Sequence, residues 1–178
     1  EAKAACDGAN DGGATEIMVN DAHDSGRNID HNLLPKNTKL IRGWSGGLFS
    51  MVQELDETYD ALMFVGYHSA AGKDTNPLSH TMSTSLDYVK INGIVASEFL
   101  IHSYIAAYLK VPVVFLSGDK GLCETAKCLN KNIVTVAVKE GKGNSTVSIH
   151  PELALELICE GAKEAIIQDR SKCIIELP

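Results

Sequence analysis

Three histidines stand at positions where a side chain could do chemistry. His23 follows a short apolar run, His68 ends the most apolar run of the chain, and His80 lies in the loop that comes next. Neutral imidazole binds metal ions, and imidazole also takes up and releases protons near neutral pH. Glycines and other small residues surround His68 and His80. We therefore expect the three imidazoles to share one site.

Polar side chains follow several of the predicted strands at the point where each strand ends. His23 lies three residues beyond the strand predicted for 16–20, and His68 ends the strand predicted for 60–67. Asp119 follows a third strand in the same way. Open α/β sheets bind ligands beyond the carboxyl ends of their strands. Independent strands would thus deliver polar groups to one edge of the sheet.

His80 and Glu98 are expected to reach the same edge by other routes. His80 follows a loop rich in Gly, Asn and Pro at 69–79, and a loop histidine near a metal suits proton transfer better than rigid ligation. Glu98 occupies the first turn of a helix that Ser97 is predicted to cap, running to about Leu109. The helix dipole favours a carboxylate there, and that carboxylate could complete a metal site.

Each of these residues also has an ordinary structural explanation. Most histidines are neither ligands nor catalysts, and we accept that reading for His31, in a polar loop, and for His150, at a helix start. His102 lies one turn after Glu98, so the two could bind a metal together, but that turn of a mostly apolar helix normally faces the core. Asp119 before a helix is normally a cap. The residues alone therefore predict a hydrolytic metal site with histidine ligands.

The elements that would position these residues alternate between helices and apolar strands. This order predicts an α/β fold with a mainly parallel sheet flanked by helices. The continuous apolar run in 60–67 predicts a strand that is buried on both faces, and Asn92-Gly93 predicts one β-hairpin excursion. The remaining expected strands are 39–42, 81–88, 112–116, 133–138 and 173–177, and the remaining expected helices are 1–10, 49–55, 119–129 and 151–168. No linker divides the chain, so we expect a single α/β domain over 1–178.

The composition excludes several classes of protein. Of the 178 residues, 44% are hydrophobic and 22% are charged, as in a soluble globular domain. The net charge of −7 argues against a nucleic-acid partner, and no apolar run approaches the roughly 20 residues of a membrane span. The five cysteines are odd in number and lack a CxxC spacing, which favours reduced thiols in a cytoplasmic protein.

Five short motifs occur in order along the chain. They are Val19-Asn20-Asp21-Ala22-His23, Gly66-Tyr67-His68, Ser79-His80-Thr81-Met82, Asn92-Gly93 followed by Glu98, and Pro112-Val113-Val114-Phe115-Leu116-Ser117-Gly118-Asp119. This ordered set closely resembles the zinc D-aminopeptidase family. Each motif is short, but together they extend over nearly the whole chain.

The resemblance implies a binuclear zinc centre in an α/β domain that releases N-terminal D-amino acids from short peptides. Carried over by motif, His23, His68 and Glu98 correspond to zinc ligands, and His80 corresponds to the catalytic histidine. His102 does not fall on a ligand position of the family. Family members assemble into rings, in one case a stacked decamer, so the resemblance also implies a ring-forming homo-oligomer.

The sequence departs from the family in one respect. The family opens with a strand that carries Asp-x-Glu-Gly, whose two carboxylates are metal ligands, and no such segment occurs here. We therefore expect that 1–178 lacks an N-terminal strand and a C-terminal part of the catalytic domain. Three protein ligands can hold one zinc, whereas two ions would need the bridging carboxylate. Two alternatives stay open at this stage: an amidase acting on another small amide, and a non-catalytic oligomeric binding module with a degenerate metal site.

Overall fold

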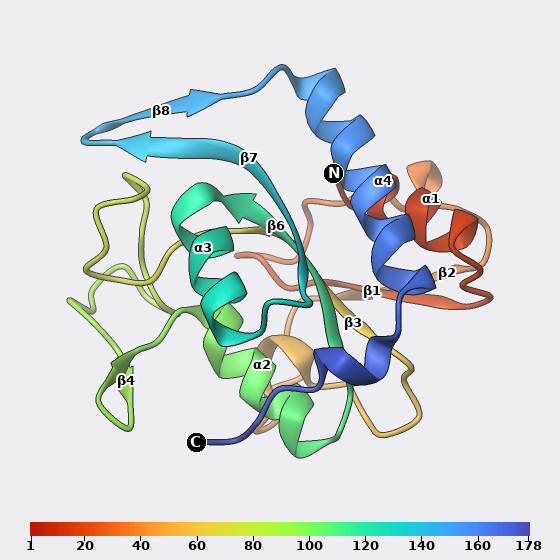
Figure 1. Ribbon diagram of the computed structural model, residues 1–178, viewed down its shortest axis with the longest axis horizontal. Coiled ribbons are helices and arrows are strands. Elements are labelled where there is room, and N and C mark those ends of the chain that lie inside the picture. The colour runs from red at the N-terminus through yellow and green to blue at the C-terminus, as the bar shows by residue number, and fades with distance from the viewer.

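A four-stranded sheet lies at the centre of the computed structural model, which describes residues 1–178 (Figure 1). Its strands, in spatial order, are β3 (Leu62–Tyr67), β6 (Val113–Asp119), β7 (Val134–Lys142) and β8 (Ser145–Ser148). The first three strands run parallel, and β8 returns antiparallel to β7. The predicted α/β class with a mainly parallel sheet is confirmed.

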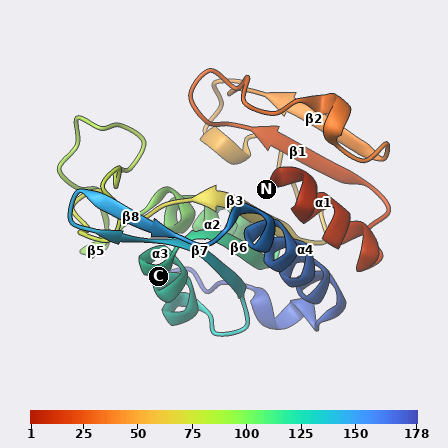
Figure 2. The same ribbon diagram turned by 90° about the horizontal axis from the view of Figure 1, so that it is seen from above.

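Helices cover both faces of this sheet. They are α1 (Ala2–Asp11), α2 (Glu98–Tyr108), α3 (Lys120–Leu129) and α4 (Pro151–Ile167). Figures 1 and 2 show α1 and α4 side by side, away from α2 and α3. Each pair of helices closes one apolar core: Phe64 and Phe99 lie in the core beside α2 and α3, and Phe115 and Ile158 lie in the core beside α1 and α4. No helix has both the length and the apolar character needed to cross a membrane.

Strand β6 is the strand buried on both faces. Every residue of β6 is buried, because β3 and β7 flank it and helices cover both sides. The sequence predicted this burial for residues 60–67 instead, and that prediction is wrong. Strand β3 lies at the edge of the four-stranded sheet, and of its residues only Phe64 is buried.

Two smaller sheets complete the structure. Strands β1 (Ile17–Asp21) and β2 (Thr38–Arg42) pair in parallel in a sheet of their own, beside α1 in Figure 2. Strands β4 (Lys90–Ile91) and β5 (Ile94–Val95) form the predicted hairpin. The φ angles of Asn92 and Gly93 are 49° and 83°, as a tight two-residue turn requires.

Several predicted elements differ from the observed ones. A second hairpin joins β7 to β8, and it was not predicted. Residues 81–88 form turns with one isolated bridge instead of a strand, and the side chains of 84–88 are exposed. The polar–apolar alternation there fits a strand, but no neighbouring strand pairs with it. The predicted helix at 49–55 is reduced to a short 3₁₀ turn, η2 (Ser50–Val52).

The predicted last strand at 173–177 is also wrong. A second 3₁₀ turn, η3 (Arg170–Cys173), precedes an extended segment that pairs with no strand. Side-chain amides replace the strand partner: Asn130 donates to the carbonyl oxygens of Lys172 and Ile174, and Asn132 donates to that of Lys172. One further 3₁₀ turn, η1 (His31–Leu33), lies between β1 and β2.

Candidate metal centre

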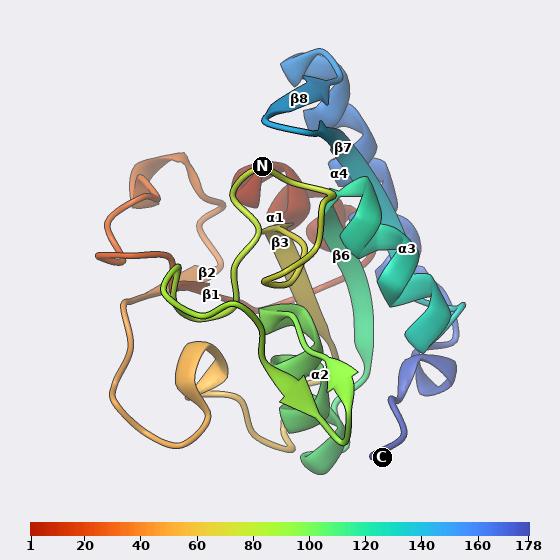
Figure 3. The same ribbon diagram turned by 90° about the vertical axis from the view of Figure 1, so that its left-hand side faces the viewer.

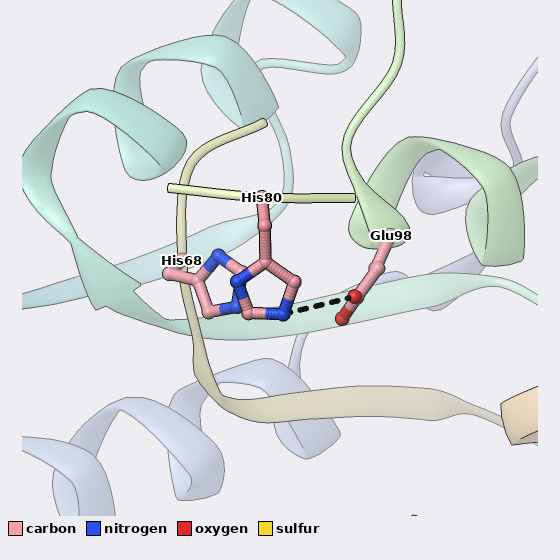
Figure 4. Close-up of side chains that lie close together, drawn as sticks. All are labelled: His68, His80 and Glu98. Atoms are coloured by element: carbon pink, nitrogen blue, oxygen red, sulfur yellow. Dashed lines mark ion pairs between the residues drawn. The ribbon is translucent and has the colours of Figure 1, made fainter. Parts of the chain in front are cut away.

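The side chains of His68, His80 and Glu98 meet beyond the carboxyl end of β3 (Figure 4). One potential ligand atom from each residue lies within 4.8 Å of those of the other two. The rings of His68 and His80 are stacked at a tilt with centroids 4.3 Å apart, and Nε2 of His80 is 3.8 Å from Oε1 of Glu98. Three residues that the sequence singled out are thus brought together from two loops and a helix.

His68 leaves the sheet through an irregularity at the end of β3. The register of the β3–β6 pairing shifts between Phe64 and Tyr67, and Gly66 has a φ of 78°. Glycine adopts this left-handed conformation without the strain that a Cβ would bring. Extra residues of this kind often redirect a side chain next to a functional site. Here the irregularity adds one residue to β3 before Tyr67 pairs again with Gly118 of β6, and His68 follows directly.

Each imidazole has one nitrogen fixed by the backbone. Nδ1 of His68 donates to the carbonyl oxygen of Ser69 at 3.0 Å, and Nδ1 of His80 donates to that of Leu78 at 2.8 Å. A carbonyl oxygen can only accept, so both Nδ1 atoms carry the proton. Neutral His68 and His80 therefore present an unprotonated Nε2, which can bind a metal or take up a proton.

Glu98 is held in place by its helix and by one backbone N–H group. The Ser97 hydroxyl accepts a hydrogen bond from the Leu100 N–H at 3.1 Å, which confirms the predicted N-cap of α2. The N–H of Met82 donates to Oε1 of Glu98 at 2.8 Å. Met82 has a φ of 62°, an uncommon conformation for a side chain of this size. This conformation accompanies the hydrogen bond that the Met82 N–H gives to the Glu98 carboxylate.

Two titratable side chains near Glu98, those of Tyr67 and His102, stay neutral. Burial, and then the charge of Glu98, raise the pKa of the Tyr67 hydroxyl far above its ordinary value. Burial lowers the pKa of His102, although its hydrogen bond and proximity to Glu98 oppose this. Nδ1 of His102 donates to the backbone oxygen of Glu98 at 2.6 Å, so the ring packs against its own helix and lies outside the metal-ligand cluster.

His23 is the predicted ligand that the structure does not bring into the cluster. It lies after β1, in the separate two-stranded sheet, and its side chain is exposed. The loop that carries it is held by buried Asp21, which accepts hydrogen bonds from the N–H groups of Asn28 and Ile29 at 2.7 and 2.8 Å. The role of His23 as a zinc ligand stays a prediction.

The cluster fits one zinc ion by the chemistry of its donor atoms. Nε2 of His68 and the Glu98 carboxylate are donor atoms of the kind that catalytic zinc uses, and Nε2 of His80 lies beside them, close enough to act as a further ligand or to transfer a proton. The Glu98 side chain is 12% exposed and the His80 side chain 23%. Solvent or a substrate can therefore reach the open side of the cluster.

Comparisons with known proteins agree with this assignment. The D-aminopeptidase of Bacillus subtilis is 34% identical over 161 residues, which make up 90% of this chain and 58% of that protein. A solved structure titled Zn-dependent D-aminopeptidase DppA from Bacillus subtilis, a self-compartmentalizing protease, matches with a TM-score of 0.85 and 31% identity. That match covers 92% of this chain and 60% of the other, so this chain spans less than two thirds of the length of these relatives. The D-aminopeptidase family model matches residues 1–178, and the chain therefore belongs to the D-aminopeptidase family, as its motifs predicted.

Proposed function

We propose that the protein is a zinc-dependent aminopeptidase that releases N-terminal D-amino acids from short peptides. The observation that carries this proposal is the meeting of His68, His80 and Glu98 within 4.8 Å in a member of the D-aminopeptidase family. The name of the Bacillus subtilis relative supports both the metal and the configuration of the substrate.

The residues of the cluster would have two roles, which are binding of the metal ion and transfer of a proton. A zinc ion held there would lower the pKa of a bound water toward about 7 and would polarise the scissile carbonyl. Nε2 of His68 and the carboxylate of Glu98 would hold the ion. Nε2 of His80, unprotonated in the neutral ring, would first take up a proton from the attacking water, and it would then give that proton to the leaving amine or donate a hydrogen bond to the oxyanion. Since Nδ1 of His80 is bound to Leu78, only Nε2 is free for this task.

A second zinc ion is proposed for the whole protein. It would be bound by His23 together with the two carboxylates of the Asp-x-Glu-Gly strand that the family carries. Metal analysis of the full protein checks this proposal: it predicts two zinc ions per chain, and one ion per chain would contradict the binuclear centre.

The assembly and location are proposed on separate grounds. A ring-forming homo-oligomer is supported by the self-compartmentalizing relative and by large apolar side chains exposed in the segment between β3 and α2, among them Leu78, Tyr88 and Ile94. A cytoplasmic location is supported by the free thiols of all five cysteines, because disulfides are rare in that compartment.

The direct test is a release assay on matched dipeptides. Full-length protein loaded with zinc is incubated with D-Ala-D-Ala and with L-Ala-L-Ala, and free alanine is measured. The proposal predicts release from the D-dipeptide at least about tenfold faster than from the L-dipeptide. Release from neither peptide by zinc-loaded protein would overturn it, and turnover of simple amides alone would indicate an amidase instead.

A further inference from the structure

The buried carboxylate of Asp119 binds both ends of the loop that joins the two histidines of the site. Asp119 ends β6 and is 0% exposed. Its Oδ2 accepts hydrogen bonds from the Ser69 N–H at 2.6 Å and from Nδ2 of Asn76 at 3.2 Å. Its Oδ1 accepts hydrogen bonds from the Ser69 hydroxyl at 2.6 Å and from the Leu122 N–H at 2.9 Å. Only the last of these four bonds belongs to the helix cap that the sequence predicted.

One chain of hydrogen bonds leads from Asp119 to His68. Asp119 fixes Ser69 through both its backbone N–H and its hydroxyl, and the carbonyl oxygen of Ser69 accepts the hydrogen bond from Nδ1 of His68. The position of Ser69 thus sets the orientation of the His68 ring.

A second chain leads from the same carboxylate to His80. Asn76 donates through Nδ2 to Asp119, and its Oδ1 accepts the Leu78 N–H at 2.9 Å. The carbonyl oxygen of Leu78 accepts the hydrogen bond from Nδ1 of His80. Figure 3 shows the loop between β3 and α2, in yellow-green, beside the start of α3, and Gly121 of α3 approaches Thr75 of the loop so closely that a Cβ would lie 2.5 Å away.

We propose that Asp119 is a positioning residue that orients the imidazoles of both His68 and His80 through these two chains. The part of this inference that concerns catalysis rests on the proposed function, but the two chains of hydrogen bonds form without a bound metal. A carboxylate suits the place because it only accepts, and here it meets four donors. Removal of a group that holds a metal-binding side chain in place by hydrogen bonds commonly lowers the metal affinity about 10- to 100-fold.

The principal test is Asp119→Asn, which keeps the size and the helix-capping ability of the residue. Its amide would place N–H donors against the N–H of Ser69 and Nδ2 of Asn76, so the chain to His80 would lose its anchor and the chain to His68 would keep only the bond from the Ser69 hydroxyl. We expect amide hydrogen exchange in residues 69–80 of the metal-free protein to speed up at least about tenfold, with exchange in α3 close to wild type. We also expect the zinc affinity, measured by chelator competition, to fall about 10- to 100-fold.

Two further variants separate positioning from simple destabilisation. Asn76→Ala keeps Asp119 and the cap and cuts only the chain to His80; it should speed exchange at 77–80, leave Ser69 protected, and lower kcat on a D-dipeptide more than it changes KM. Asp119→Asn combined with Asn76→Asp restores an acceptor opposite the new amide and should recover part of the zinc affinity. Asp169→Asn, at the cap of η3, is the matched control and should change none of these quantities.

The outcomes distinguish this inference from the proposed function. If Asp119→Asn and Asn76→Ala both leave loop exchange and zinc affinity within about twofold of wild type, or if exchange rises equally throughout the chain, Asp119 is only a structural cap. If wild-type protein binds no zinc, the proposed function fails, and the exchange measurements on metal-free protein still decide whether Asp119 orders the loop. Should Asp119→Asn fail to fold, Asn76→Ala still decides whether the chain from Asp119 positions His80.

Discussion

At the scale of single residues, the site depends on which ring nitrogen each histidine leaves free. Carbonyl oxygens of the neighbouring backbone hold Nδ1 of both His68 and His80, so both present Nε2 toward the space beside Glu98. The same geometry permits His80 to bind the metal or to transfer a proton. A substitution that removes only this ring separates the two roles.

We expect His80→Ala to lower turnover of a D-dipeptide by about 10²- to 10⁴-fold, the usual range for a lost general acid or base. Zinc content should stay at the wild-type level, because His68 and Glu98 remain to hold the ion. Metal analysis and steady-state kinetics on the same preparation check both parts. His31→Ala, at an exposed position at the start of η1, serves as the control. Loss of zinc together with activity would make His80 a ligand.

Asp21 provides a prediction on stability and pH. Burial opposes its ionisation, but hydrogen bonds from Asn28 and Ile29 and the charge of Arg42 outweigh burial and lower its pKa. A carboxyl group whose pKa is lowered by folding stabilises the folded state above its unfolded pKa, and this contribution is lost as the pH falls through the folded pKa. Asp21→Asn should therefore reduce the free energy of unfolding at pH 7 by about 1.5–3 kcal/mol.

Urea unfolding at several pH values measures this effect. The difference between wild type and Asp21→Asn should shrink as the pH falls below about 4, where an unperturbed aspartate takes up its proton. Asp24→Asn is the control, since Asp24 is exposed and Asn tolerates its φ of 49° equally well. A difference that does not change with pH would mean that the lost stability does not come from the carboxylate charge.

At the scale of elements, the end of β3 directs His68 into the site. In a regular strand the side chains would alternate without interruption up to His68, and the left-handed conformation of Gly66 breaks that alternation before Tyr67 pairs again with Gly118 of β6. Glycine is needed there because the pairing register shifts between Phe64 and Tyr67. The turn places Ser69 within reach of Asp119, at the end of the neighbouring strand.

Gly66→Ala should lower stability and weaken zinc binding together. Alanine in the left-handed region costs about 1–2 kcal/mol, and relief of that strain would move His68. Gly143→Ala is the matched variant, because Gly143 also has a positive φ, of 59°, but lies in the β7–β8 turn with open space around it. Both variants should lose similar stability in thermal unfolding. Equal zinc affinities in chelator competition would show that the turn at Gly66 does not position His68.

At the scale of the whole molecule, the fold does not depend on the metal. The two cores on either face of the central sheet consist of apolar side chains, and His68, His80 and Glu98 belong to neither. A metal that binds only the folded state still stabilises it by mass action. The protein should therefore be folded without zinc and more stable with it.

Removal of zinc with a chelator should leave the far-ultraviolet circular dichroism unchanged and abolish peptide hydrolysis. Added zinc should restore activity and raise the free energy of unfolding by about 4 kcal/mol when free zinc is about 1,000 times its Kd. Magnesium at the same concentration is the control, because it prefers oxygen ligands. An unfolded metal-free protein would contradict the independence of the cores from the site.

The amino-acid sequence by itself determined the features that depend on local pattern. The spacing of apolar residues predicted the helices and most strands of an α/β fold, Ser97 and Asp119 marked two helix starts, and Asn92-Gly93 marked a hairpin. These features were predictable because capping, turn geometry and periodicity are set by residues close together in the chain. The ordered motifs further identified the family.

Only the tertiary structure decided which residues meet. The alternation at 81–88 and the apolar residues at 173–177 resembled strands, but a strand needs a partner strand. Next to 173–177, the side chains of Asn130 and Asn132 donate to the backbone carbonyls of Lys172 and Ile174 instead. The meeting of the histidines with Glu98, and the two chains that start at Asp119, depend on contacts between residues up to 50 positions apart. Such contacts follow from how strands and helices pack, which no short stretch of sequence encodes.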